Sequence, residues 1–326
     1  MIIIKVRNGI GNQLFIYAFG EFLRMKFPQQ KILYDFSELP YSVNGRNTIC
    51  FSEFVKNVDI LEPKDVRKYL GKILYFHRFS SNDKNFLNKL KVKIINNLRV
   101  KKNNIYIKEP LDSEEERLKF TDKIFAMNFE NNNYVFDGFW EDIRYAECVK
   151  EQLRYNINFS GVDIKNDYKK YINNYSLISV HIRRGDYIKE SFSDLYPRYF
   201  YAFCDDDYYC KAIEFINDSV KNPMFVFFSD DIDYVKEKYK NITNKIIIEG
   251  QRDYEDMYLM TLCDHHIVAN STFSFWGAYL GHNNNGITIA PNLHYARMIS
   301  HDKIWIKEYF KVDNWKYIEV GDKLNA

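Results

Sequence analysis

The chain has little cysteine and no long apolar run. Only 5 of its 326 residues are cysteine, and no two of them have the CxxC spacing of a zinc or redox site. This usage indicates reduced thiols in a cytosolic protein. No stretch approaches roughly 18 consecutive apolar residues, and Met1–Val6 is too short for the core of a signal peptide. We therefore expect neither a membrane span nor secretion.

The chain also lacks a net charge of any size. Lys and Arg number 46 and Asp and Glu number 44, so the formal charge of +2 provides no broad positive field for nucleic acid. Any anion site must be local. The dinucleotide fingerprint GxGxxG is missing too, because Gly9 and Gly11 are followed by Asn12, Gln13 and Leu14. The first turn therefore does not indicate dinucleotide binding.

The composition is that of a folded protein with enough apolar material for two cores. Hydrophobic residues make up 46% of the chain and charged residues 28%, which excludes wholesale disorder. A length of 326 residues exceeds that of a usual single core and favours two domains. Residues 156–174 are polar and loosely patterned, so the boundary is placed there. The expected domains are residues 1–160 and 161–326.

Alternating strand and helix patterns predict an α/β fold. Near-continuous apolar strands separated by helices imply a parallel sheet that is covered on both faces. The expected strands are 2–6, 31–35, 104–107, 123–127, 134–139, 177–182, 223–228, 245–248, 266–269 and 286–290. The expected helices are 14–27, 141–155, 206–220, 232–239, 254–263 and 272–280.

Polar side chains follow the strands of the second half. Arg183 and Arg184 come directly after strand 177–182, and the carboxyl ends of parallel strands form the ligand crevice of open α/β sheets. Adjacent strand residues point to opposite faces, so we expect Arg183 to bind a doubly charged phosphate group and Arg184 to brace the loop. An ion pair with Asp186 or Asp230 is the structural alternative.

A second anion-binding element is the predicted helix start at Ser271–Ser274. The first N–H groups of a helix and the positive end of its dipole favour an anion. Together with Arg183 they would hold a pyrophosphate. The alternative is that Asn270 or Ser271 merely caps the helix.

Histidines and aspartates are open to two interpretations. His181 lies between apolar strand residues and is either a core residue or part of the binding site. His265 and His266 lack the spacing of a zinc site and are expected to be structural. The acidic runs Asp205–Asp207 and Asp230–Asp231 suit a hard cation, but acids also complement helix starts. We therefore expect no metal site.

Four short segments form a specific series of motifs. They are Gly9–Ala18, His181–Tyr187, Phe228–Asp231 and Asn270–Trp276. In this order, and spanning nearly the whole chain, they resemble the motifs of bacterial α-1,2-fucosyltransferases of glycosyltransferase family 11. The chain departs from the family at Asn8, where a glycine is common, and at Phe275, where a tryptophan is common. These departures affect the expected acceptor rather than the phosphate chemistry.

The resemblance implies a GT-B architecture, in which two Rossmann-like domains enclose a cleft. GDP-β-L-fucose would bind mainly to the carboxyl-terminal domain, and the transfer would form Fucα1-2Gal on O2 of a terminal β-galactose with inversion. It implies no metal and no cofactor, because a guanidinium replaces the cation at the pyrophosphate. The family suggests synthesis of a surface polysaccharide such as O-antigen or lipopolysaccharide. The expected location is the cytoplasm, with peripheral contact to the inner membrane left open.

The resemblance also implies roles for single residues. Arg183 would stabilise the charge on the diphosphate, and Asp186 or Glu190 would take the acceptor proton. Asp256, and with it His181, would hydrogen-bond guanine, since a carboxylate selects guanine over adenine. The remaining donor contacts would be Ser229, Asp230, Asn270, Ser271, Thr272, Phe273 and Ser274, and the contacts on the fucose or acceptor side would be Gly11, Asn12 and Gln13. The alternative for the last three is a helix start without a ligand.

Two other interpretations stay open. A transferase of this kind could form an α-1,3 or α-1,6 linkage or use another GDP-sugar. A module that binds a nucleotide or glycan without turnover is the non-enzymatic alternative. The presence of Arg183, Asp186 and Asp256 favours an enzyme.

Overall fold

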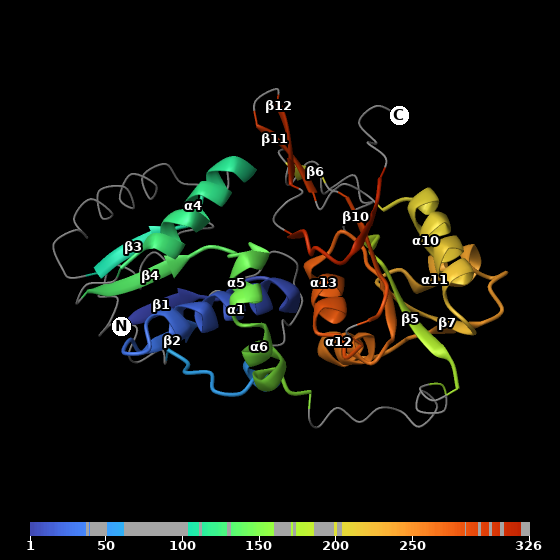
Figure 1. Ribbon diagram of the computed structural model, residues 1–326, viewed down its shortest axis with the longest axis horizontal. Helices are drawn as coiled ribbons and strands as arrows, with labels where there is room; N and C mark the ends of the chain where they lie inside the picture. The colour runs from blue at the N-terminus through green and yellow to red at the C-terminus, as the bar shows by residue number, and fades with distance from the viewer. Residues whose placement is uncertain are drawn as a thin grey trace. The chain divides into compact units, whose positions relative to one another are not determined.

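The computed structural model divides into two compact units (Figure 1). One comprises Met1–Leu111 and Glu115–Asn158, and the other Asp112–Glu114 and Phe159–Ala326. Within the part of the chain that is described, no helix combines the length and apolarity needed to cross a bilayer. The structure describes residues 1–36, 39, 51–61, 104–110, 113–128, 132–159, 171, 174–185, 199–200, 204–283, 285–292, 295–299, 302–306 and 310–320.

The first unit contains a four-stranded parallel sheet in the order β2-β1-β4-β3. Strands β1, β2 and β4 are almost wholly buried, as their apolar runs predict. Helix α1 is buried along most of its length, and its Phe19 stacks on Trp140 with ring centroids 4.1 Å apart. The elements are β1 Ile2–Lys5, α1 Ile10–Lys26, β2 Ile32–Asp35, η2 Phe51–Glu53, β3 Asn104–Lys108, α4 Glu114–Ala126, β4 Asn133–Asp137, α5 Ile143–Cys148 and α6 Lys150–Asn156.

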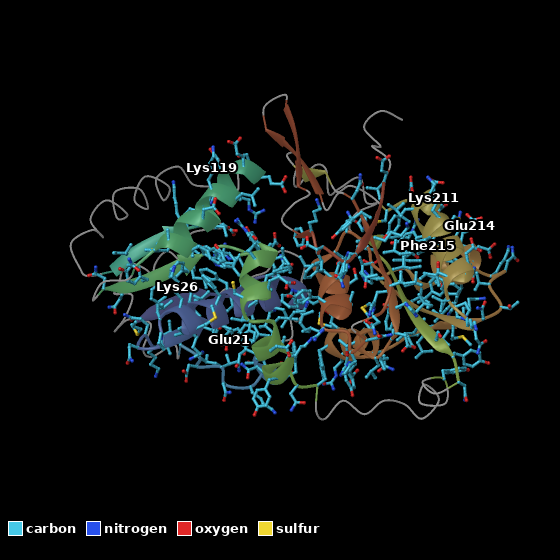
Figure 2. The ribbon with its side chains drawn as sticks, in the orientation of Figure 1. Glu21, Lys26, Lys119, Lys211, Glu214 and Phe215 are labelled. Carbon is cyan, nitrogen blue, oxygen red and sulfur yellow. The ribbon has the colours of Figure 1, made fainter. Side chains whose placement is uncertain are left out.

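Charged side chains of α1 join it to neighbouring helices. Glu21 is 4% exposed, pairs with Arg24 at 3.1 Å and accepts a hydrogen bond from Asn156 of α6 at 3.2 Å. Lys26, labelled with Glu21 in Figure 2, donates to the carbonyl oxygen of Ile124 at 3.1 Å, near the end of α4, where the helix dipole favours a cation. These contacts anchor α1, whose first turn carries the glycine motif.

Two predictions for this unit are wrong in detail. Residues 123–127 lie mostly in the last turn of α4 and form no strand. Helix α4 buries Arg117, Thr121 and Ile124 at helical spacing, and its two polar members hide that spacing from a hydrophobicity pattern. The expected helix 141–155 is divided into α5 and α6 at Val149, whose φ of −128° is not helical.

The second unit contains a six-stranded sheet in the order β13-β10-β9-β5-β7-β8, in which all neighbours are parallel. This confirms the predicted alternation of strands and helices, to which β13 and a three-stranded antiparallel sheet of β6, β11 and β12 are unpredicted additions. The elements are β5 Ser176–Ile182, β6 Tyr199–Phe200, α10 Asp206–Ser219, β7 Pro223–Ser229, α11 Ile232–Lys238, β8 Lys245–Ile247, α12 Asp253–Thr261, β9 His265–Ile267, α13 Thr272–Tyr279, β10 Thr288–Pro291, β11 Tyr295–Ile299, β12 Asp302–Ile306 and β13 Lys316–Ile318.

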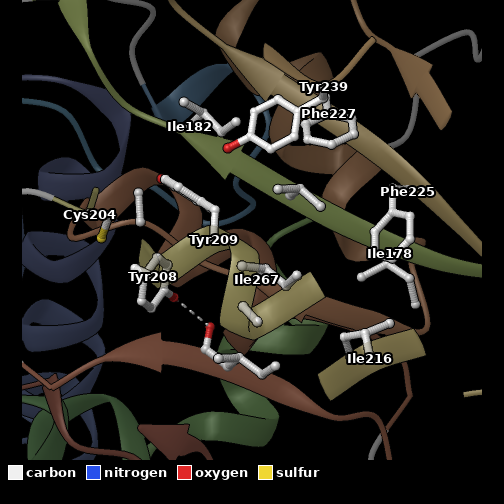
Figure 3. Close-up of a cluster of buried hydrophobic side chains, with 14 of the residues drawn as sticks. Ile178, Ile182, Cys204, Tyr208, Tyr209, Ile216, Phe225, Phe227, Tyr239 and Ile267 are labelled. Atoms are coloured by element: carbon white, nitrogen blue, oxygen red, sulfur yellow. Dashed lines mark hydrogen bonds between the residues drawn. The ribbon is translucent and has the colours of Figure 1, made fainter. Parts of the chain in front are cut away.

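The two faces of this sheet pack into different clusters. Ile178, Val180 and Ile182 of β5 belong to the cluster of Figure 3, which also contains side chains of α10 and α11. Leu177 belongs to the cluster on the opposite face, which contains side chains of α12. Because side chains alternate along a strand, His181 lies on the face of Leu177.

Candidate functional site

Two polar loops meet at the carboxyl end of the second unit's sheet. Strands β5 and β7 are neighbours, and their last residues, Ile182 and Ser229, are paired in register. The next residues after the two strands, Arg183 and Asp230, therefore lie side by side. Arg183 Nη1 is 2.6 Å from Asp230 Oδ2. The two side chains are 15% and 18% exposed. The ion pair that the sequence left open thus forms with Asp230, and both groups still reach the surface.

Asp230 also holds the loop after β5. Its Oδ1 accepts hydrogen bonds from the backbone N–H groups of Arg184 at 2.9 Å and Gly185 at 3.1 Å. Burial opposes its charge, but Arg183 and these two N–H groups outweigh burial and hold the pKa of Asp230 below its ordinary value. A Cβ on Gly185 would lie 2.5 Å from Asp230 Oδ2, so a larger residue there would displace the Asp230 carboxylate. An ionised Asp230 therefore positions both Arg183 and the loop.

Ser229 and Arg184 complete the support of this loop. The Ser229 hydroxyl donates to the last carbonyl oxygen of β5 at 2.8 Å and accepts from the backbone N–H of Asp231 at 3.0 Å. Arg184 Nε lies 3.1 Å from Asp231 Oδ2, and its guanidinium lies 3.4 Å from the centre of the Tyr234 ring. Arg183 and Arg184 therefore have different partners, and Arg184 is the arginine that braces the loop.

His181 precedes these arginines in β5. It is 7% exposed, and its ring lies 5.4 Å from that of Phe273. Burial, followed by the charge of Arg183, lowers the pKa of His181 to about 3, so the imidazole is neutral at pH 7. Its Nδ1 is buried, and none of the described residues hydrogen-bonds it. A neutral imidazole has one donor and one acceptor nitrogen, so His181 offers an uncharged hydrogen bond to a ligand.

The start of α13 uses its serine hydroxyls internally. Ser271 is the N-cap and accepts a hydrogen bond from the backbone N–H of Phe273 at 3.3 Å. Ser274 is 1% exposed, and its hydroxyl hydrogen-bonds the backbone that precedes the helix. Asn270 is also buried, whereas Thr272 and Phe273 are half-buried. The capping alternative thus describes Ser271, and the predicted phosphate contact rests on the N–H groups of the helix start.

Asp256 is a half-buried residue in the first turn of α12. No residue in the described part of the chain hydrogen-bonds its Oδ1. Burial, followed by the charges of Asp253 and Glu255, raises the pKa of Asp256 to about 7. Helix α12 packs closely on α13, since a Cβ on Gly277 would lie 2.6 Å from Met260 Sδ. A buried carboxylate oxygen without a partner is costly to the fold, so it favours the predicted role of Asp256 in accepting hydrogen bonds from a ligand.

The two predicted proton acceptors, Asp186 and Glu190, lie outside the residues that the structure describes. They follow Gly185, the last residue of the loop that Asp230 holds. The assignment of the base to this segment therefore stays a prediction.

Gly11, Asn12 and Gln13 lie in the first turn of α1. Gln13 is fully buried, and its amide donates to the carbonyl oxygen of Asn8 at 2.9 Å and accepts from the backbone N–H of Phe51 at 3.0 Å. Gln13 therefore holds the glycine loop in place. Gly11 is buried as well, whereas Asn12 is half-buried. The predicted contact with a sugar thus depends on Asn12.

Three charged residues that the sequence analysis did not identify meet at the carboxyl end of the first unit's sheet. Glu109 and Glu141 follow β3 and β4, and both pair with Arg117 of α4. All three are buried. Their sequence position could have indicated them. Glu109 directly follows β3, as Asp230 directly follows β7, and Glu141 follows the turn after β4.

Similar sequences were found among characterised proteins. The O-antigen biosynthesis glycosyltransferase WbnK of Escherichia coli is 28% identical over 304 residues, which cover 89% of this chain and 93% of WbnK. The alpha-1,2-colitosyltransferase of Escherichia coli is 38% identical over 172 residues, which cover 50% of this chain and 56% of that enzyme. The galactoside alpha-(1,2)-fucosyltransferase 1 of Homo sapiens is 28% identical over 110 residues, which cover 32% and 29% of the two chains.

A solved structure and a family profile complete the comparison. The crystal structure of the fucosyltransferase NodZ from Bradyrhizobium has a TM-score of 0.54 at 15% identity, and the match covers 94% of this chain and 98% of NodZ. This likeness shows the GT-B fold, as expected from the sequence. The profile of Glycosyl transferase family 11 matches residues 1–319. The chain therefore belongs to glycosyltransferase family 11.

Proposed function

We propose that the chain is an inverting fucosyltransferase that moves L-fucose from GDP-β-L-fucose to O2 of a terminal β-galactose. Family membership supports a glycosyl transfer, and the names of the colitosyltransferase and the human fucosyltransferase support an α-1,2 linkage. The likeness to WbnK over nearly its whole length supports an acceptor that belongs to a bacterial surface polysaccharide. We place the reaction in the cytoplasm, at the inner face of the inner membrane.

The observation that carries the proposal is a guanidinium and an unpartnered carboxylate at the same end of one sheet. Arg183 follows β5, and Asp256 lies in the first turn of the helix that follows β8, so both stand at the carboxyl edge. A guanidinium suits a diphosphate. A carboxylate can accept hydrogen bonds from both N1–H and N2–H₂ of guanine. The two residues together favour a guanosine diphosphate donor.

The proposed reaction breaks the bond between fucose and the β-phosphate. The electron pair of that bond goes to the departing phosphate oxygen, while the sugar becomes oxocarbenium-like. Arg183, held by Asp230, stabilises the growing negative charge without rearranging. The acceptor O2 attacks from the opposite face of the sugar, which inverts the linkage, and its proton passes to a base. Asp186 and Glu190 are the candidates for that base.

We expect the activity to persist in EDTA, because no metal ion is part of the proposed mechanism. The acidic runs that suit a cation have other partners. Asp230 and Asp231 pair with Arg183 and Arg184, and Asp205 caps α10. The test compares the rate of GDP release in EDTA with the rate after Mg²⁺ or Mn²⁺ is added. Loss of activity in EDTA that either cation restores would revive a carboxylate metal site.

Donor and linkage are tested in one experiment. The protein is incubated with lactose and GDP-fucose, GDP-colitose or GDP-mannose, and the product is analysed by NMR. We expect Fucα1-2Gal from GDP-fucose. The colitosyltransferase likeness makes colitosyl transfer the second candidate, which a faster reaction with GDP-colitose would establish. An α-1,3 or α-1,6 product would overturn the linkage, and GDP binding without any product would indicate a binding module.

A further inference from the structure

Glu141 belongs to a buried cluster of charges at the carboxyl end of the first unit's sheet. Arg117 Nη2 lies 3.3 Å from Glu109 Oε1 and 3.5 Å from Glu141 Oε2. The exposed fractions are 1% for Arg117, 4% for Glu109 and 7% for Glu141. One guanidinium therefore serves two carboxylates where water has little access. Ionising both would leave a buried net negative charge, which is costly.

Glu109 is the better satisfied of the two carboxylates. Its Oε2 accepts hydrogen bonds from the backbone N–H groups of Phe139 at 2.7 Å and Trp140 at 3.0 Å. These bonds hold the turn after β4, in which Trp140 has a φ of 56°. The turn lies against Glu109, since a Cβ on Gly138 would lie 2.5 Å from the Glu109 Cβ. Glu109 thus fixes the backbone that carries Glu141.

Glu141 is the carboxylate left to bind a proton. Burial, opposed by Arg117 and reinforced by Glu109, raises the pKa of Glu141 to about 7. Its Oε1 accepts a hydrogen bond from Asn12 Nδ2 at 3.3 Å. An asparagine amide has a donor end and an acceptor end, so this bond decides which end faces Glu141 and which faces away.

We propose that Glu141 is a positioning residue that orients the Asn12 amide for contact with the sugar. Asn12 lies in the first turn of α1, the helix that follows β1, and Glu141 follows the neighbouring strand β4. Their bond therefore joins the start of α1 to the segment after β4, at the edge where parallel sheets bind ligands. The inference rests on the proposed function, in which Asn12 lies on the sugar side. Protonation of Glu141 removes its charge and weakens the bond to Asn12.

A double-mutant cycle tests whether Glu141 acts through Asn12. We expect Glu141→Leu and Asn12→Ala each to lower kcat/KM about tenfold, the size of a hydrogen bond to a charged group. The double variant should lose no more than either single one. Glu141→Gln keeps an acceptor oxygen but, like protonated Glu141, carries no charge, so it should recover only part of the lost rate. Losses that multiply in the double variant would show that Glu141 acts independently and would overturn the proposal.

The matched control is Glu115→Gln on α4. Glu115 pairs with Lys119, which is labelled in Figure 2, and the two side chains are 77% and 67% exposed. This change removes one carboxylate charge from the same helix that carries Arg117, but not from the cluster. We expect the wild-type rate. A loss equal to that of Glu141→Leu would show that charge alone, and not the contact with Asn12, explains the effect.

The pH profile is a readout that a merely structural role would not change. At saturating donor, the wild-type kcat should fall as the pH drops through about 7, because Glu141 becomes protonated. This fall on the acidic side of the pH profile should be absent in Glu141→Gln. The charged groups that face Glu141 in the described part of the chain are Arg117 of α4 and Glu109 after β3. Of these two, the arginine side chain does not lose its proton at these pH values. A fall that persists in Glu141→Gln would contradict the proposal.

A measurement without substrate separates this inference from the proposed function. In protein labelled with ¹⁵N-asparagine, the side-chain amide signal of Asn12 should shift with a midpoint near pH 7, and Glu141→Gln should abolish the shift. Failure to transfer from any donor would overturn the function and leave this titration intact. An Asn12 amide that does not respond to pH would overturn the inference alone.

Discussion

Arg183→Ala is expected to lower the turnover number at least about a hundredfold, the effect of removing one preorganised donor from a developing charge. Asp230 holds the guanidinium at 2.6 Å, so Arg183 needs no rearrangement when charge grows on the departing diphosphate. The loss should appear mainly in kcat, because the interaction strengthens as the bond breaks. Rates of GDP release at saturating donor and acceptor measure it.

Two further variants separate charge from geometry. Arg183→Lys keeps the charge but loses the planar fork that contacts two phosphate oxygens, so we expect a partial recovery. Arg184→Ala is the matched control, because Arg184 packs on Tyr234 and pairs with Asp231. It should lower the melting temperature and reduce kcat far less. An Arg183→Ala protein that is folded by circular dichroism and turns over at a near-normal rate would remove Arg183 from the mechanism.

The part of the site that the sequence predicts is the part that strand geometry alone determines. Alternation along a strand assigns Arg183 and Arg184 to different faces, and the structure gives them different partners. Parallel order brings the residue after β5 next to Asp230, the residue after β7. These conclusions need only the order of strands and helices, which the apolar runs of the second half reveal. Asp256, in contrast, is indicated only by the resemblance to family 11.

The features that the sequence did not predict depend on tertiary partners. Arg117 and Glu141 are charged residues in or near amphipathic segments, where such residues usually face water, yet both are buried because they meet each other and Glu109. Gln13 is buried because its amide accepts from Phe51, which is 38 residues away. Polar groups enter a core only when partners satisfy them, and the position of those partners is not encoded locally.

Asp256→Asn is expected to weaken GDP binding at least about tenfold, the effect of losing a hydrogen bond to a charged acceptor. Guanine presents two donors, N1–H and N2–H₂, and a carboxylate can accept from both. Asparagine turns one of these acceptors into a donor that faces another donor. The preference for GDP over ADP should narrow as well, because the site would no longer select the guanine edge. Isothermal titration calorimetry with the two nucleotides measures both effects.

The same change is expected to stabilise the free protein at pH 8. The pKa of Asp256 is about 7 in the fold against an ordinary 3.8, so the folded state holds the proton more tightly than the unfolded state. The contribution of Asp256 to the free energy of unfolding is therefore fully present below about pH 4 and is lost as the pH rises through 7. Asparagine does not titrate and avoids this loss. Urea unfolding at pH 8 should show a gain of about 1–3 kcal/mol, which shrinks as the pH approaches 5.

Saturating GDP should reverse this order of stability. Guanine supplies donors to the Asp256 carboxylate, so the nucleotide stabilises the wild type by mass action more than it stabilises the variant. Asp253→Asn is the matched control, because Asp253 is an exposed acid in the same turn, and GDP affinity should change little. Unchanged GDP affinity in Asp256→Asn would mean that guanine is bound elsewhere. A variant no more stable than the wild type at pH 8 would mean that Asp256 already has a partner, and the strongest argument for a guanosine nucleotide would be lost.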